Sequence, residues 1–376
     1  MTPQFPELET PALLVERPIL ERNLEEMAEV ARRNGVTLRP HAKTHKSPLI
    51  GRLQVERGSP GLTVATLAEA EAMADAGIDD LLIAYPPVGE WRLRRLEKVA
   101  ERTQATVTVD SEEAVKGLAK AGAALGRELA FLWKVDSGLH RMGTPPREPS
   151  AEAVASVLGH PGTRFRGLMT HAGHAYGASS TEDLHAVARE EGRSVVDTAE
   201  LLRDRGIPVE VVSVGSTPTA RVVAEVSGVT EIRPGTYVFN DATQVALGVV
   251  GPEHCAQTVL ATVVGRPAPD RAVVDSGSKA LPRDVLTDRT TGYGLVVDHP
   301  ELVVDRLYEE HAVLVAPEGR CRLEIGQRVR IISNHCCTAT SLHPRFYLVD
   351  GDRVEEEVPV MARDWRGDRR ADLTRR

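Results

Sequence analysis

The sequence predicts a (β/α)8 barrel of the TIM type followed by a smaller antiparallel β domain. Short runs rich in β-branched residues alternate with segments of helical spacing, and this alternation occurs eight times. Eight repeats match a closed barrel, and an open doubly wound sheet is the alternative that the pattern leaves. After about residue 245 the rhythm changes to short strands broken by turns, which predicts the β domain.

Each barrel strand is expected at an apolar run that polar or helical sequence follows. The eight runs are VTLRPH (36–41), LTVAT (62–66), LLIAYP (81–86), TVTVDS (106–111), AFLWKVD (130–136), FRGLMTHAG (165–173), VEVVSVGS (209–216) and VTEIRPG (229–235). Helices are expected over 17–35, 111–126 and 181–206, the last charged on one face and closed by a glycine.

The expected domain boundaries follow from this change of rhythm. The barrel is predicted over residues 17–245 and the β domain over 246–376. The apolar run ALLVE (12–16) could add a strand to the β domain, which would then include residues 1–16.

Composition excludes several classes of partner. The formal net charge is −8, and no basic block precedes the C-terminal stretch RGDRRADLTRR, which we expect to be a solvated terminus. We therefore expect no nucleic-acid partner and no membrane-surface partner. No apolar run approaches the length of a membrane span, and the N-terminus lacks a signal-peptide pattern. The four cysteines form no C-x-x-C pair. A cytoplasmic protein without structural disulfides is expected.

Reactive residue types follow the predicted strands, at the edge where barrels carry their active sites. Lys43 follows the first strand in RPHAKTHK. A partly desolvated lysine at a barrel mouth can form a Schiff base with a carbonyl group, whereas an ordinary surface lysine is the alternative.

Two glycine-containing turns indicate a phosphate site. GSTPT and RPGTY follow the seventh and eighth strands, where barrels commonly bind phosphate, and they offer hydroxyl donors at Ser216, Thr217, Thr219 and Thr236. A lysine and a phosphate site in one barrel mouth suggest pyridoxal 5'-phosphate as the cofactor.

The ordered motifs LRPHAKTHKSPLI, KVDSGLHRMG, THAGHAY, SVGSTPT, EIRPGTYVFND, DSGSKAL and NHCCT resemble the family of D-threonine aldolases and eukaryotic-type D-serine dehydratases. These are fold-type III pyridoxal-phosphate enzymes with an alanine racemase-like barrel, and the resemblance covers nearly the whole chain. It implies a lyase that acts on β-hydroxy-D-amino acids, and a homodimer.

The resemblance also implies roles for individual residues. Lys43 would hold the cofactor, Arg141 would lie near its phenolic oxygen, and Arg233 would lie toward its pyridine nitrogen. The phosphate would be bound by Ser216, Thr217, Gly235, Thr236 and Tyr237.

THAGHAY contributes His171, His174 and Tyr176 to the same mouth. Structural histidines are the alternative for each imidazole. His174 and Tyr176 are the better candidates for catalysis, because an imidazole or a phenol near the substrate can act as a base or position it.

NHCCT contains the candidate metal ligands. If this segment is extended, His335 and Cys337 project to one side and Cys336 to the other. An imidazole and a thiolate can bind zinc, and in the family an H-x-C or H-x-D pair at this place binds a divalent cation. Manganese is the alternative metal. Cys336 is expected to serve in packing.

The sequence does not decide which bond of the substrate is broken, so two lyase reactions remain open. Aldol cleavage to glycine and an aldehyde is favoured, because the flanking motifs resemble bacterial D-threonine aldolases. Dehydration of D-serine or D-threo-3-hydroxyaspartate to a keto acid and ammonia is the alternative, since the cysteine at 337 resembles that branch. A racemase would have no use for the metal, and non-catalytic pyridoxal-phosphate carriers lack the β domain.

Overall fold

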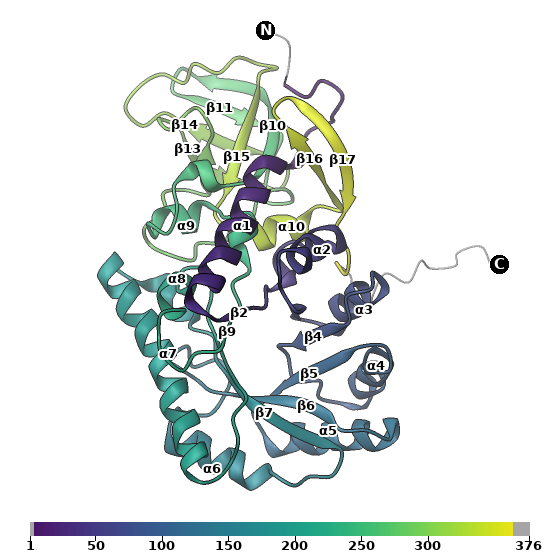
Figure 1. Cartoon of the computed structure of the whole chain (residues 1–376). Coiled ribbons are helices and arrows are strands. Elements are labelled where there is room, and N and C mark those ends of the chain that lie inside the picture. Colours follow the sequence, from purple (N-terminus) through teal and green to yellow (C-terminus); the bar gives the residue numbers. More distant parts are fainter. Residues whose placement is uncertain (1–3, 364–376) are drawn as a thin grey trace, which may run out of the picture. The chain divides into compact units, whose positions relative to one another are not determined.

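The computed structural model describes residues 4–363, so the basic C-terminal stretch lies outside the described residues. The chain forms two compact units (Figure 1). Within the described residues, one unit contains the barrel and comprises residues 26–175, 182–235 and 361–363; the other is rich in β-strands and comprises residues 4–25, 176–181 and 236–360.

The barrel unit contains the eight parallel strands that the sequence predicts. Their bounds are β2 Thr37–Leu38, β3 Leu62–Val64, β4 Asp80–Ile83, β5 Gln104–Val109, β6 Leu129–Lys134, β7 Thr163–Met169, β8 Val211–Val214 and β9 Glu231–Ile232. The order is β2-β9-β8-β7-β6-β5-β4-β3, so the first and last strands of the barrel pair with each other. A parallel bridge between His41 and Thr63 joins the remaining edges. The sheet is therefore closed, and the prediction of a barrel is confirmed.

Helices follow the strands in the expected alternation (Figure 1). They are α1 Arg17–Asn34, α2 Pro48–Glu56, α3 Leu67–Asp75, α4 Glu90–Ala100, α5 Glu112–Leu125, α6 Glu148–Val157, α7 Thr181–Asp204 and α8 Ala220–Val223. The α5 helix shows how local sequence sets its ends. Ser111 caps its N-terminus by accepting a hydrogen bond from Ala114, and Gly126 ends it in the left-handed conformation.

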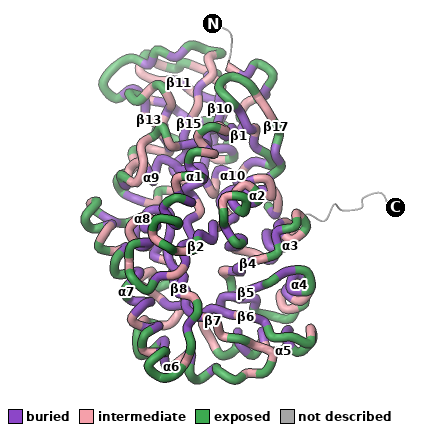
Figure 2. Tube along the Cα trace, viewed as in Figure 1, coloured by how far each residue is buried: buried purple, intermediate pink, exposed green. Residues whose placement is uncertain are grey.

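Side chains along a barrel strand point in turn into the barrel and toward its outside. Leu82, Leu132 and Met169 form a cluster from three different strands. Because side chains two apart in a strand share a face, Lys134 projects to the same side as Leu132. The strands β5, β6 and β8 are largely buried (Figure 2). The end of β6 thus places a lysine in a desolvated position.

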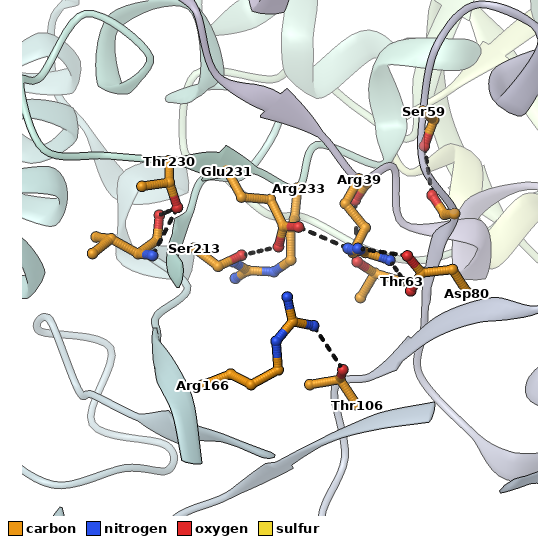
Figure 3. Close-up of polar contacts among 12 residues, drawn as sticks. Arg39, Ser59, Thr63, Asp80, Thr106, Arg166, Ser213, Thr230, Glu231 and Arg233 are labelled. Carbon is orange, nitrogen blue, oxygen red and sulfur yellow. Dashed lines mark hydrogen bonds and ion pairs between the residues drawn. The ribbon is translucent and has the colours of Figure 1, made fainter. Parts of the chain in front are cut away.

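A chain of charged groups occupies the buried side of several strands (Figure 3). Arg39 donates to Glu231 over 2.7 Å and to Asp80 over 2.8 Å. Ser213 donates to Glu231 and accepts from Arg233 over 2.6 Å. Buried charges are tolerated when they are paired in this way, and the pairing fixes Arg233 at the end of β9.

The second unit is built on a nine-stranded sheet of order β11-β14-β13-β12-β15-β10-β1-β16-β17. Its strands are β1 Ala12–Glu16, β10 Gln257–Ala268, β11 Arg271–Val274, β12 Gly294–Val296, β13 Val303–Leu307, β14 Ala312–Val315, β15 Arg328–Ser333, β16 Arg345–Asp350 and β17 Arg353–Pro359. Two short helices accompany it, α9 Ala242–Ala246 and α10 Cys336–Leu342.

The N-terminal run ALLVE forms β1 within this sheet. It pairs antiparallel with β10 and parallel with β16. The other pairings of this sheet are antiparallel, so the predicted antiparallel β domain is confirmed with this one parallel pair. The reason is that β1 comes from the distant N-terminus, which frees its direction from the hairpin connections that make sequential strands antiparallel. Within residues 4–363, no helix is both long enough and apolar enough to cross a membrane.

Candidate active site

Lys43 lies in a single 3-10 turn, Ala42–Thr44, that follows the first barrel strand. The side chain of His41 caps this turn by accepting a hydrogen bond from the Lys43 backbone over 3.4 Å. Gly235 packs closely against the turn, and a Cβ there would lie 2.8 Å from the Thr44 hydroxyl and 3.2 Å from the His41 Cβ. Any larger residue at 235 would push the loop after β9 away from the lysine turn.

Four cationic side chains influence one another around the barrel mouth. Burial is the main reason that the pKa of Lys134 falls to about 7, and the positive charges of Arg233, Arg141 and Lys43 add to it. Burial also lowers the pKa of Arg233, to about 10. The negative charge of Glu191 opposes the shift at Lys134 but is outnumbered by Lys43, Arg141 and Arg233, so the mouth carries an excess of positive charge, which an anionic ligand would balance.

The same field acts on two histidines that flank the lysine. Desolvation and the charge of Lys43 hold the pKa values of His41 and His171 well below the usual range. Both imidazoles are therefore neutral at physiological pH and can accept or donate a hydrogen bond without adding charge.

The predicted phosphate-binding residues of the barrel lie in buried turns. Ser216 and Thr217 are each under 5 % exposed and follow β8. Gly215, just before them, has φ near +99°, a conformation that favours glycine. Hydroxyl groups and a glycine turn beside an excess of positive charge suit a phosphate group, so these residues fit the cofactor that the sequence suggests.

His174 lies in the 3-10 turn Gly173–Gly177 after β7. Gly138 leaves space for its ring, since a Cβ at 138 would lie 3.2 Å from the ring atoms. The His174 Nδ1 atom is buried and has no hydrogen-bond partner among the described residues. A buried ring nitrogen without a partner is a candidate contact for a ligand.

Three of the residues predicted to bind the cofactor or to act in catalysis belong to the second unit. Thr236 and Tyr237 are buried in the 3-10 turn Thr236–Val238, directly after Gly235 in the chain. Burial, together with the negative charge of Asp241, raises the pKa of Tyr176 above its usual range. The Tyr176 phenol therefore stays protonated and is suited to donate a hydrogen bond rather than to act as a base.

The segment NHCCT is not extended, which corrects the geometry expected from the sequence. His335 is the N-cap of α10, and Cys336 and Cys337 begin that helix. Alternation along a strand therefore cannot place His335 and Cys337 on one side. They nevertheless meet, because the N-cap conformation turns the imidazole toward the first helical turn, where it contacts the Cys337 thiol.

Asp284 holds the His335 ring in place. The Nδ1 atom of His335 lies 2.5 Å from Asp284 Oδ2, and Thr338 donates to the same oxygen over 2.6 Å. Burial disfavours the charged imidazolium, but Cys337 and Asp284 outweigh it and raise the pKa of His335 to about 10. A carboxylate that accepts from Nδ1 is the arrangement of many histidine ligands to metals; at neutral pH Nε2 also carries a proton here, which a metal ion would displace.

Cys336 differs from its neighbour. It is 1 % exposed, and burial raises the pKa of its thiol well above the usual range, so it stays protonated. This agrees with a role in packing. Among residues 4–363, no group of three or more His, Cys, Asp or Glu side chains is arranged to hold a metal ion. The metal prediction therefore depends on the pair His335 and Cys337.

Three important residues were not identified from the sequence. Lys134 gave a usable signal, because it continues the inward face of an apolar strand. Glu191 lies among the buried positions Leu184, Ala188 and Val195 of α7, and a carboxylate on the apolar face of a helix is also a signal. Asp284 lies in an irregular loop, and nothing local to its sequence indicates His335 as its partner.

Comparisons with known proteins show which family the chain belongs to. Residues 15–243 match the family model described as alanine racemase, N-terminal domain, and residues 256–349 match the putative serine dehydratase domain. The chain is 36 % identical over 361 residues to a D-threo-3-hydroxyaspartate dehydratase of Delftia sp. (strain HT23), covering 92 % of this chain and 95 % of the relative. The chain belongs to the family of D-threonine aldolases and D-serine dehydratases with an alanine racemase-type barrel. The resemblance seen in the sequence is thereby confirmed.

Solved structures agree with this family. A D-threonine aldolase from Filomicrobium marinum superposes with a TM-score of 0.88 at 32 % identity, over 95 % of this chain and 96 % of that one. A D-threo-3-hydroxyaspartate dehydratase with a cysteine-to-alanine substitution, in the metal-free form, superposes with a TM-score of 0.87 at 34 % identity, over 94 % and 98 %.

Titration of Lys134 gives a prediction for the cofactor-free protein. The folded-state pKa is about 7 and an unfolded lysine titrates near 10.4, so between these values the unfolded state binds more protons and stability rises with pH. Below about pH 7 the full cost of burying the ammonium is present. Lys134→Met should therefore raise the free energy of unfolding more at about pH 6 than at about pH 9, measured by urea denaturation.

Lys98→Met is the matched control, because Lys98 is exposed on α4. Its effect should be small and equal at both pH values. An equal gain at both pH values for Lys134→Met would contradict the assigned titration.

Proposed function

We propose that this protein is a lyase that acts on β-hydroxy-D-amino acids with pyridoxal 5'-phosphate and a divalent metal ion. The observation that carries the proposal is the excess of positive charge around Lys43, formed with Lys134, Arg141 and Arg233. Such a mouth is suited to a phosphate and to the carboxylate of an amino acid. Family membership supports the same class of reaction.

The proposed cofactor contacts follow the barrel strands. Lys43 would hold the cofactor covalently, while Ser216, Thr217 and Gly235, followed by Thr236 and Tyr237, would bind its phosphate. When bound, pyridoxal phosphate withdraws the electrons that remain at Cα after one of its bonds is broken. Arg141 is proposed for the phenolic oxygen of the ring.

Arg233 is proposed to face the pyridine nitrogen. Its guanidinium is held by Ser213 and by the carbonyl of Thr170, so it has a fixed orientation. An arginine cannot accept a proton from that nitrogen, and the ring would therefore remain neutral.

The remaining chemistry is assigned to residues of this chain. Lys43 is proposed to accept the Cα proton, because its amine is the predicted covalent partner of the cofactor. His174 and Tyr176 are proposed to position the substrate, with Tyr176 as a hydrogen-bond donor because its phenol stays protonated.

His335 and Cys337 are proposed as ligands of a zinc ion. A thiolate and an imidazole suit zinc better than manganese, whose preferred ligands are oxygens. A bound zinc ion would act as a Lewis acid toward the β-hydroxyl of the substrate, with two protein ligands leaving room for water and substrate. The hydrogen bond from His335 to Asp284 supports ligation through Nε2.

Two reactions are open to this class of lyase. We propose dehydration as the first candidate, which reverses the order expected from the sequence. In dehydration the Cα proton and the β-hydroxyl leave as water, and the released enamine is hydrolysed to a keto acid and ammonia. The His335 and Cys337 pair and the 36 % identity to a dehydratase favour it. Aldol cleavage to glycine and an aldehyde is the second candidate, favoured by the flanking motifs and by the similarity to a solved D-threonine aldolase.

A homodimer stays a prediction from family resemblance.

Product analysis tests the proposed function. We expect D-threonine, D-serine and D-threo-3-hydroxyaspartate to be converted to keto acids and ammonia, and their L-enantiomers to be unchanged. Glycine with an aldehyde would instead establish aldol cleavage. A chelator should abolish turnover, and added zinc should restore it. No turnover of any D-substrate by the cofactor-loaded protein would contradict the lyase assignment.

Metal content tests the proposed ligands independently of activity. His335→Ala and Cys337→Ala should each lower the zinc that copurifies with the protein by at least about tenfold, because each removes one of two protein ligands. Cys336→Ala is the matched control, since its thiol is buried and protonated. Zinc retained in both ligand variants, or lost equally in Cys336→Ala, would overturn the assignment; the measurement is inductively coupled plasma mass spectrometry.

A further inference from the structure

Glu191 is a buried carboxylate that the proposed function does not use. It lies in α7 and its exposed fraction is 0 %. A carboxylate loses favourable hydration when it is buried, so it is tolerated only where donors surround it. The identity of those donors shows what the residue holds in place.

Three donors converge on Glu191, and all belong to loops at the barrel mouth. Its Oε1 accepts from the Ala172 backbone over 3.1 Å and from the Gly215 backbone over 2.9 Å. Its Oε2 accepts from the Thr219 hydroxyl over 2.7 Å. One side chain thus connects the loop after β7 with the turn after β8.

The Thr219 hydroxyl extends this connection to Ser216. It accepts from the Ser216 backbone over 3.0 Å while donating to Glu191. Both peptide N–H groups at the start of the turn, those of Gly215 and Ser216, are therefore fixed by Glu191, one directly and one through Thr219. Gly215 has a positive φ there, which glycine adopts without strain, and its hydrogen bond to Glu191 holds that conformation.

Helix α7 supplies Glu191 from a rigid element. Ala188 and Val195 lie on the same buried face of the helix, at 0 % exposure. A turn tied to a packed helix does not have to reorganise when its ligand arrives, which is how a supporting residue increases affinity.

We propose that Glu191 is a positioning residue that preorganises the turn Gly215–Thr219 for the phosphate group of the cofactor. The inference rests on the proposed function, because it assumes that this turn binds that phosphate. It assigns Glu191 no contact with the cofactor. The expected consequence is selective, in that binding through the phosphate depends on Glu191 while binding at Lys43 does not.

Two ligands separate this role from a merely structural one. Pyridoxal 5'-phosphate and pyridoxal share the ring and the aldehyde but differ in the phosphate. Their dissociation constants are measured by absorbance titration of the cofactor-free protein for wild type, Glu191→Ala, Glu191→Gln and Thr219→Val. Glu200→Gln, an exposed position of the same helix, is the control.

Glu191→Ala should weaken binding of pyridoxal 5'-phosphate by about tenfold or more, because it removes charge-assisted hydrogen bonds that hold the turn. Binding of pyridoxal should change by less than about twofold, a difference too small to reflect a lost hydrogen bond. Glu191→Gln keeps one oxygen for the two peptide donors and should show a smaller loss in the same direction, as should Thr219→Val. Glu200→Gln should match wild type.

Unchanged affinity for pyridoxal 5'-phosphate in the folded variants would overturn the proposal, and so would an equal loss for both ligands. Circular dichroism checks folding. If Glu191→Ala does not fold, Glu191→Gln and Thr219→Val decide the outcome by the same criteria. If the wild-type protein itself fails to bind pyridoxal 5'-phosphate, the proposed function is contradicted. If wild type and variants all bind it normally, only the proposed role of Glu191 is contradicted.

Discussion

The positive charge gathered at the barrel mouth is the constraint on which the rest of the site depends. The charges of Lys43, Arg141 and Arg233 act on Lys134, and burial makes the charges of Lys134 and Arg233 costly. The protein offsets this cost in three ways: the pKa of Lys134 falls, His41 and His171 stay neutral, and Arg233 is tied to the paired charges behind it. The remaining positive charge favours anionic ligands, and the phosphate and the amino-acid carboxylate of the proposed function would supply them.

The second unit contains the proposed metal ligands. Its His335 and Cys337 are soft donors at the start of a short helix, and Asp284 orients the imidazole. Hydrogen bonds to Asp241 tie this helix to α9, because the Asp241 carboxylate accepts from the backbones of both Cys336 and Gln244. The two units suit different ligands because their residue types differ. Hydroxyl groups and glycine turns at strand ends suit phosphate, whereas a thiolate and an imidazole suit zinc.

Prediction from sequence succeeded where a residue's position depends on its own strand. All eight barrel strands could be found from their apolar runs, and Lys43 and Ser216 lie after β2 and β8 as expected, while their roles stay predictions. It failed at the N-terminus of α10, because a helix of seven residues leaves little periodic signal and NHCCT follows a strand without a break. Asp284 could not be predicted, since its partner His335 lies 51 residues away and only the folded chain brings them together.

Reduction with borohydride followed by peptide mass mapping tests the central claim most directly, because it fixes the cofactor on the residue that binds it. The protein is loaded with pyridoxal 5'-phosphate, reduced and digested. The account predicts one labelled site, Lys43, even though Lys134 in the same mouth has the lowered pKa that favours a reactive amine. Labelling of Lys134 or of any other lysine, or no labelling, would contradict the account.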